Sequence, residues 1–186
     1  SLVNLPIKEF KCDTCPAGKV SQAGDLVCTD CAAGLFSDLT KQHVCKRCLP
    51  GSWSDSIGAI AVSVCTDCLV GYYSAAYAAS QITQCNACAP GKASNIVGAD
   101  HSNTCVDCFA GETSTTAGSI TCVDCEIGKY SATSGQPICM PCIPGSFQPQ
   151  TSQTSCLDCQ AGRYTETTAS NTCIYPDDGF VVGPSQ

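Results

Sequence analysis

Apolar and polar residues alternate only over short stretches of this chain. Lys129-Tyr130-Ser131 is typical, because one bulky residue lies between two polar ones. Such alternation predicts a short strand with one covered face. Glycines near the middle of the intervening loops, such as Gly58 and Gly98, supply chain reversals. No 3.6-residue periodicity is long enough for a helix, so the sequence predicts short hairpins.

A repeated motif, Cys-x-x-Cys-x-x-Gly, organises these strands and occurs nine times. Its glycine is present in every repeat: Gly18, Gly34, Gly51, Gly71, Gly91, Gly111, Gly128, Gly145 and Gly162. A bulky residue usually follows two positions later, and serine usually follows that residue. A position without a side chain at constant offset from a cysteine predicts a positive φ or a close chain approach.

The motif divides the chain into three parts. Residues 1–11 form an apolar lead-in that Pro6 keeps from being helical, residues 12–173 hold nine tandem repeats, and residues 174–186 form a tail. First cysteines follow each other at steps of 16 or 17 residues, except for 20-residue steps to Cys65, Cys85 and Cys105. The additional residues are expected in surface loops.

Composition favours a secreted protein. The 186 residues include 19 cysteines but one Trp and 5 Phe, so bulky side chains are too few for a common core. Each repeat must depend on cross-links, which persist in oxidising compartments. We therefore expect an extracellular or cell-surface location. The start at Ser1, without a charged or apolar leader, is expected for a mature chain or a piece of a longer one.

Charge disfavours two classes of partner. Nine Lys and Arg stand against 16 Asp and Glu, a net charge of −7. This balance repels nucleic acid and anionic lipid. The longest apolar run, residues 57–64, is too short to cross a bilayer, so no membrane segment is predicted.

The cysteine series favours one disulfide scheme, in which the second cysteine of each pair bonds to the first of the next. The predicted bridges are Cys15 to Cys28, Cys31 to Cys45, Cys48 to Cys65, Cys68 to Cys85, Cys88 to Cys105, Cys108 to Cys122, Cys125 to Cys139, Cys142 to Cys156 and Cys159 to Cys173. Cys12 is then unpaired or pairs outside the chain. Bonding within each pair would instead leave Cys173 alone. Each loop closure is worth roughly 3 kcal/mol.

Metal binding is the main alternative, because Cys-x-x-Cys at intervals near 17 residues is also typical of zinc knuckles. The small number of charged residues and the lone Cys173 argue against it. A thioredoxin-like redox motif would occur once, at a helix start. We expect no cofactor and no metal.

The repeat resembles the ephrin-receptor-like cysteine-rich repeat, in the pattern Cys-x-x-Cys-x-x-Gly-x-[Tyr/Phe]-Ser from Cys12 to Cys173, with looser similarity to tumour necrosis factor receptor modules. The resemblance implies rod-forming spacers in receptor ectodomains or in large secreted or surface proteins. The expected fold is small, disulfide-rich and mostly β or irregular: an elongated linear array of about nine hairpin-like repeats, each contacting mainly its neighbours.

Candidate sites are few. His43 and His101 lie far apart in the sequence, and neither has a Ser, Cys or acidic partner at a spacing typical of a catalytic site. No catalytic residue is therefore predicted. Five linkers read Cys-x-Asp-Cys, at Asp30, Asp67, Asp107, Asp124 and Asp158. These carboxylates could bind calcium, but a turn in which Asp caps a backbone N–H is favoured.

Side chains at fixed offsets raise two further alternatives. The aromatic series could be a binding stripe, although packing within the small repeat is favoured: Phe36, Trp53, Tyr73, Tyr130, Phe147 and Tyr164. Candidates for O-linked glycan on exposed loops are Thr113, Ser114, Thr115, Thr116, Thr165, Thr167 and Thr168. Solvated hydroxyls in strands are the other interpretation of these residues.

These observations predict a structural extracellular protein or rod segment, and no enzyme. The apolar lead-in and the tail residues Phe180, Val181 and Val182 suggest head-to-tail assembly of copies into a filament. Copies of the chain, or other surface and matrix proteins, are the expected partners. The alternative is a receptor ectodomain or binding module for a protein ligand.

Overall fold

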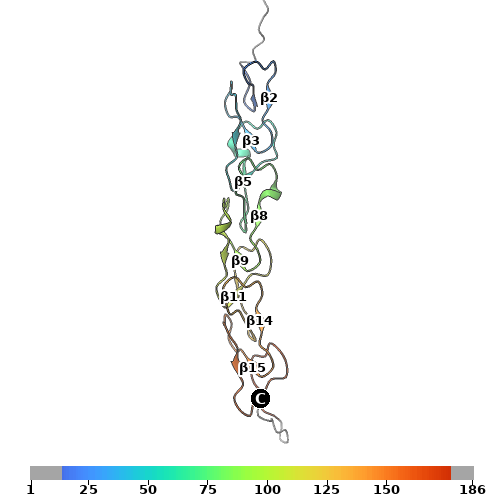
Figure 1. Ribbon diagram of the computed structural model, residues 1–186, viewed down its shortest axis with the longest axis vertical. Coiled ribbons are helices and arrows are strands. Elements are labelled where there is room, and N and C mark those ends of the chain that lie inside the picture. The colour runs from blue at the N-terminus through green and yellow to red at the C-terminus, as the bar shows by residue number, and fades with distance from the viewer. Residues whose placement is uncertain (1–13, 177–186) are drawn as a thin grey trace, which may run out of the picture. The chain divides into compact units, whose positions relative to one another are not determined.

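A computed structural model of the chain describes residues 14–176. These residues belong to two compact units. The first contains the residues up to Leu69 with Tyr73–Asn86 and Val97–His101, and the second contains Val70–Tyr72, Ala87–Ile96 and the residues from Ser102 onward. Within each unit the repeats follow one another in chain order (Figure 1). The predicted lead-in, Cys12 and the tail residues 180–182 lie outside the described residues.

Eight antiparallel hairpins of two-residue strands form the sheets of the described chain. They are β1 (Lys19–Val20) with β2 (Thr29–Asp30), β3 (Leu35–Phe36) with β4 (Lys46–Arg47), β5 (Ser52–Trp53) with β6 (Thr66–Asp67), β7 (Tyr72–Tyr73) with β8 (Asn86–Ala87), β9 (Lys92–Ala93) with β10 (Val106–Asp107), β11 (Glu112–Thr113) with β12 (Val123–Asp124), β13 (Lys129–Tyr130) with β14 (Met140–Pro141) and β15 (Ser146–Phe147) with β16 (Leu157–Asp158). The first strand follows the fixed glycine, and the second lies between the cysteines of the next pair. The predicted fold class, short hairpins in a tandem disulfide-rich array, is confirmed.

The three 20-residue repeats each end in one turn of 3₁₀ helix, immediately before the first cysteine of the next pair. The turns are η1 (Val62–Val64), η2 (Ile82–Gln84) and η3 (Ser102–Thr104). The N–H groups of Cys65 and Cys85 donate to the carbonyls of Val62 and Ile82, each at 2.9 Å. A turn closed by an i→i+3 bond needs only three residues, so the insertion forms a compact local structure.

Nine disulfides join the second cysteine of each pair to the first cysteine of the next, with Cα atoms 5.5 to 5.8 Å apart. These bonds are those of the disulfide scheme that the cysteine series favours. The second cysteines from Cys15 to Cys142 are at most 1% exposed and form the centre of each repeat. The buried core of each repeat therefore consists largely of disulfide bonds.

The same backbone hydrogen bonds join each repeat to the next. In one junction the N–H of Gly34 donates to the carbonyl of Ser54 at 2.7 Å, and the N–H of Cys48 donates to the carbonyl of Gly34 at 2.9 Å. The N–H of Gly58 donates to the carbonyl of Cys31 at 2.7 Å. Equivalent bonds recur in the other repeats. Backbone contacts of this kind couple neighbouring repeats as in other repeat proteins.

Seven of the nine fixed glycines, all except Gly145 and Gly162, also approach a carbonyl two repeats further on. Gly34 has a φ of +78°, and a Cβ atom there would lie 2.2 Å from the carbonyl oxygen of Ala78. Gly128 also has a φ of +78°, and a Cβ atom there would lie 2.0 Å from the carbonyl oxygen of Ala169. Positive φ and close approach, which the sequence offered as alternatives, therefore occur together. The expectation that a repeat contacts mainly its neighbours was incomplete, because second neighbours also meet.

Small side chains fill the space between neighbouring hairpins. The serines that follow the bulky position are nearly inaccessible, with Ser37 1% exposed and Ser74 and Ser131 0% exposed. Ala79 is also 0% exposed. Backbones of adjacent repeats lie within hydrogen-bond distance, so larger side chains would not fit here. Among the described residues, every buried side-chain nitrogen and oxygen has a hydrogen-bond partner.

Candidate interaction surface

The Asp residues of the Cys-x-Asp-Cys linkers lie opposite the residue that follows the fixed glycine. In two hairpins that residue is a lysine: Lys19 Nζ lies 2.9 Å from a carboxylate oxygen of Asp30, and Lys92 Nζ lies 2.6 Å from one of Asp107. In these two hairpins the Asp side chain therefore forms a cross-strand ion pair rather than the expected hydrogen bond with a backbone N–H. Asp30 also lies over the next repeat, since a Cβ at Gly58 would be 2.9 Å from its Oδ1.

Other hairpins lack the lysine. Glu112 lies opposite Asp124, which places two carboxylates across from each other. Ser52 lies opposite Asp67, and Ser146 lies opposite Asp158. Like charges directly opposite weaken a hairpin. The linker Asp is therefore paired in some repeats and available to solvent or to a partner in others.

The aromatic side chains lie on the first strands of the hairpins and beside an alanine of the next repeat. Parallel bridges join Phe36 to Ala59, Trp53 to Ala79, and Tyr73 to Ala99. Phe36 is buried, whereas Trp53 and Tyr73 are half-buried. The arrangement favours the packing interpretation, because these residues are at least half-buried and their backbone is paired with the following repeat.

The two histidines are held separately by local contacts. Nδ1 of His43 is hydrogen-bonded to the carbonyl oxygen of Ser21 at 2.7 Å. Nδ1 of His101 lies 2.8 Å from Oδ1 of its neighbour Asp100 and lowers the pKa of that carboxyl group. Both contacts are typical of surface histidines.

The predicted glycan acceptors fall into a buried group and an exposed group. Thr113, Ser114 and Thr165 are only 5%, 3% and 7% exposed, which disfavours them as acceptors. Their hydroxyl groups bond to other repeats; Thr113 Oγ1, for example, donates to the carbonyl of Gln136 at 2.9 Å. A hydroxyl group with little exposure and a hydrogen bond to another repeat is a poor acceptor for a glycan. The exposed candidates that stay predictions are Thr115, Thr116, Thr167 and Thr168.

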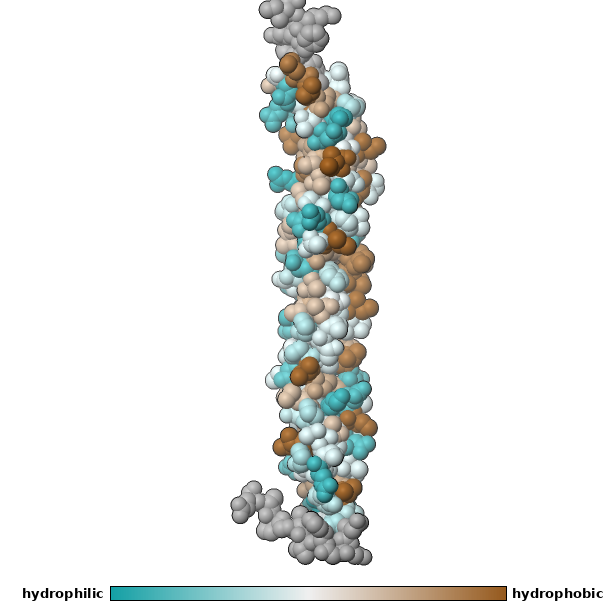
Figure 2. All heavy atoms as spheres, turned by 90° about the vertical axis from the view of Figure 1, so that its right-hand side faces the viewer, coloured by the Kyte–Doolittle hydropathy of each residue, from teal (hydrophilic) through white to brown (hydrophobic). Residues whose placement is uncertain are grey.

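Large apolar side chains are exposed in many repeats. Leu49, Leu69, Phe109 and Ile143, each directly after a second cysteine, are 65% to 73% exposed. Figure 2 shows apolar side chains distributed among polar ones over the visible face. Single exposed apolar residues are normal on protein surfaces, so exposure alone does not mark a binding site.

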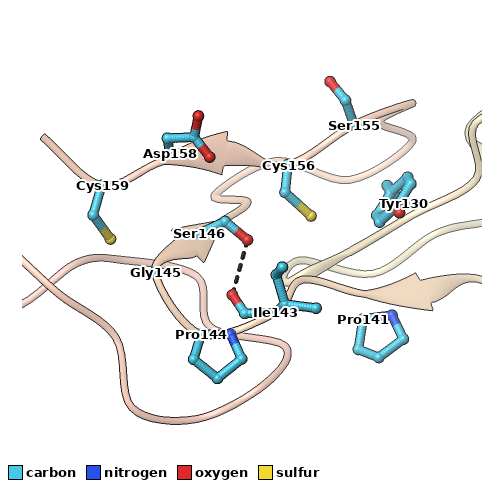
Figure 3. A pocket seen from close by; sticks show the side chains of 10 residues that line it. All are labelled: Tyr130, Pro141, Ile143, Pro144, Gly145, Ser146, Ser155, Cys156, Asp158 and Cys159. Carbon is cyan, nitrogen blue, oxygen red and sulfur yellow. Dashed lines mark hydrogen bonds between the residues drawn. The ribbon is translucent and has the colours of Figure 1, made fainter. Parts of the chain in front are cut away.

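One groove in the second unit combines apolar and acidic groups. It has a volume of about 510 Å³ and lies between the β13–β14 and β15–β16 hairpins. Pro144, Ile143 and Pro141 form one side, and Asp158, Cys156 and Ser155 lie along the other, as Figure 3 shows. Tyr130 closes one end, and Gly145, Ser146 and Cys159 complete the lining. Sequence reasoning missed this groove.

No group of three or more His, Cys, Asp or Glu side chains among residues 14–176 is arranged to hold a metal ion. None of the helices in this part of the chain is long and apolar enough to span a membrane.

The hairpins, the serial disulfides and the exposed surfaces define a class, that of small disulfide-rich tandem-repeat modules. The sequence profile described as "Tyrosine-protein kinase ephrin type A/B receptor-like" matches residues 18–65 and 128–173, about half of the chain. The chain belongs to this ephrin-receptor-like family. No curated protein matches it. The family and the nine disulfides fit an extracellular location.

Proposed function

We propose that the chain is a structural spacer segment of an extracellular protein. The observation that carries the proposal is the covalent and backbone continuity of the repeats. Each described loop is closed by a disulfide, and the same backbone hydrogen bonds recur between one repeat and the next. Such a segment resists extension and proteolysis because few residues can unfold without breaking a sulfur link.

Mechanical extension of single molecules tests this function. Under oxidising conditions the chain should lengthen little, because most residues lie inside closed loops. Replacing Cys125 and Cys139 together by Ser opens a loop of sequence separation 14. That change should add about 45 Å of extension, at about 3.5 Å per residue. An oxidised wild-type chain that extended like an open polypeptide would refute the structural role.

Self-assembly is a finer part of the same proposal. The apolar tail residues 180–182, which lie outside the described part of the chain, motivate a head-to-tail contact between copies. Deleting residues 177–186 should then reduce oligomer size in light scattering. An unchanged size distribution would remove the filament while leaving the spacer function in place.

A binding module for a protein ligand is the second candidate, and the groove of Figure 3 favours it. Mutation of the groove should then weaken capture of a ligand without affecting mechanical extension. We also propose that the chain is not an enzyme. Support comes from the separation of His43 and His101, each engaged in a local contact.

A further inference from the structure

The groove between β13–β14 and β15–β16 is amphipathic. Its apolar side includes Ile143, which is 69% exposed, with Pro141 and Pro144 beside it. Asp158, an exposed carboxylate, lies on the opposite side (Figure 3). A long side chain with an apolar stem and a cationic end matches both sides at once, because such side chains cover apolar surface while their charge stays near water.

The position of Asp158 within its hairpin supplies the second observation. Asp30 and Asp107 occupy the same position, and each is paired with the lysine opposite. Opposite Asp158 stands Ser146, whose hydroxyl donates to the carbonyl of Ile143 at 2.8 Å. No hydrogen bond or ion pair from residues 14–176 reaches the Asp158 carboxylate.

The distribution of charged residues near the groove also favours a cationic ligand. The sequence contains no Lys or Arg between Lys129 and Arg163, and Lys129 is paired with Glu126 at 3.0 Å. The net charge of the chain is −7. Arg163 lines a neighbouring pocket together with Asp158, but its guanidinium group lies over the ring of Tyr175, 4.3 Å from the centroid, and no ion pair within residues 14–176 joins it to Asp158. A cation at Asp158 is therefore expected from a partner, because an acidic chain attracts a basic one.

We propose that this groove binds a lysine or arginine side chain presented by an extended segment of a partner protein. The charged group lies at Asp158, where the lysine stands in the β1–β2 and β9–β10 hairpins, and the methylene stem lies on Ile143 and the two prolines. A single carboxylate is too few for a metal ion, which prefers several oxygen ligands. The inference rests on the binding function placed second above and is independent of the spacer function.

The test uses the full oxidised, isotope-labelled chain and capped peptides, followed by amide chemical shifts in NMR. The probe is acetyl-Gly-Val-Lys-Val-Gly-amide, its Arg form is a second probe, and its norleucine form is the uncharged control. We expect the lysine probe to shift Tyr130, Ile143 and Asp158, and the norleucine probe to bind about fivefold more weakly. Asp158→Asn should weaken the lysine probe by the same factor.

Two variants sharpen the test. Ser146→Lys places a lysine opposite Asp158, as in the two paired hairpins, and should remove binding by filling the groove from within. Asp67→Asn is the matched control, because Asp67 also faces a serine but lies against the next repeat, where a Cβ at Gly98 would be 3.2 Å from its Cγ. It should leave binding unchanged.

Three results would overturn the proposal: equal affinity for lysine and norleucine probes, unchanged affinity of the lysine probe for Asp158→Asn, or shifts spread evenly over all acidic residues. The absence of any shift up to the solubility limit of the probe would do the same. The mechanical test of the spacer function is untouched by each of these outcomes, so the two proposals can fail separately.

Discussion

At the residue scale, volume decides what this chain can place between its repeats. Most buried positions hold cysteine, serine or alanine, as at Cys48, Ser74 and Ala79. Bulky apolar residues such as Leu49 are instead 67% exposed. Neighbouring backbones approach within hydrogen-bond distance, and only small side chains fit between them. The usual relation between hydrophobicity and burial is therefore reversed at these positions.

A pair of glycine substitutions separates strain from close approach. Gly128 and Gly162 have similar φ values, +78° and +83°. A Cβ at Gly128 would lie 2.0 Å from the carbonyl oxygen of Ala169, whereas no described atom lies within 4 Å of the same position at Gly162. Gly162→Ala should cost about 1 kcal/mol, from the left-handed conformation alone. Gly128→Ala should cost about 3 kcal/mol or more, because the backbone must also move.

Amide hydrogen exchange in the oxidised chain measures both costs locally. Gly128→Ala should raise exchange at Cys142 and Ala169, whose N–H groups bond across this junction. Gly162→Ala serves as the control for the backbone strain. Equal effects from the two substitutions would show that the contact between second neighbours does not stabilise the fold.

The pKa of Asp38 gives a second residue-scale prediction. A hydrogen bond from Lys46, with Nζ at 2.8 Å, lowers the pKa of Asp38 below its ordinary value of 3.8. Because the folded pKa lies below the unfolded one, the stabilising contribution is present above about pH 4 and is lost as the pH falls through the folded value. Lys46→Met should raise the pKa of Asp38 toward 3.8 in an NMR titration. Lys92→Met, in another hairpin, should leave it unchanged.

At the element scale, each described hairpin has two-residue strands, and in five of them the linker Asp occupies a cross-strand position. Such short hairpins are marginal by themselves, so a pair of charges is a sizeable part of their stability. The β1–β2 and β9–β10 hairpins hold a Lys–Asp pair, whereas β11–β12 places Glu112 opposite Asp124. This repeat has the least favourable charge arrangement of those compared.

Glu112→Lys should therefore stabilise its hairpin by about 0.5 kcal/mol, because it replaces repulsion by the ion pair found in two other hairpins. Hydrogen exchange at Val123 and Asp124 reports the gain. The effect should shrink in about 1 M salt, which screens exposed charges. Lys92→Glu is the reciprocal control and should destabilise β9–β10 by a similar amount. A gain that is insensitive to salt would contradict the electrostatic explanation.

Much of this element structure could be predicted from cysteine and glycine spacing. The hairpins follow the glycine, and the loops are those that the spacing indicates. The 3₁₀ turns were missed because three residues are too few to show a period. The groove was missed because Tyr130 and Asp158 belong to different hairpins, and their approach depends on how those hairpins stack. Burial of Thr113 was missed for the same reason.

At the scale of the whole molecule, stability comes from serial covalent links supplemented by backbone hydrogen bonds between repeats. The disulfide loops have sequence separations of 13 to 17. Each closure of this size stabilises by roughly 3 kcal/mol in the chain-entropy description. A domain of ordinary net stability has about 5–15 kcal/mol in all. The loss of every closure should therefore exceed what the remaining contacts can supply.

Complete reduction tests this balance. The chain is treated with a phosphine reductant at moderate temperature, its thiols are blocked, and far-ultraviolet circular dichroism and amide exchange are compared before and after. We expect loss of the hairpin signal and of protection at the junction amides of Gly34, Cys48 and Gly58, because their bonds join repeats that the disulfides hold in shape. Blocking reagent without reductant is the control and should change neither measurement. Junction amides that remained protected in the reduced chain would mean that backbone pairing between repeats suffices, and the disulfides would then only limit the extension of an already stable array.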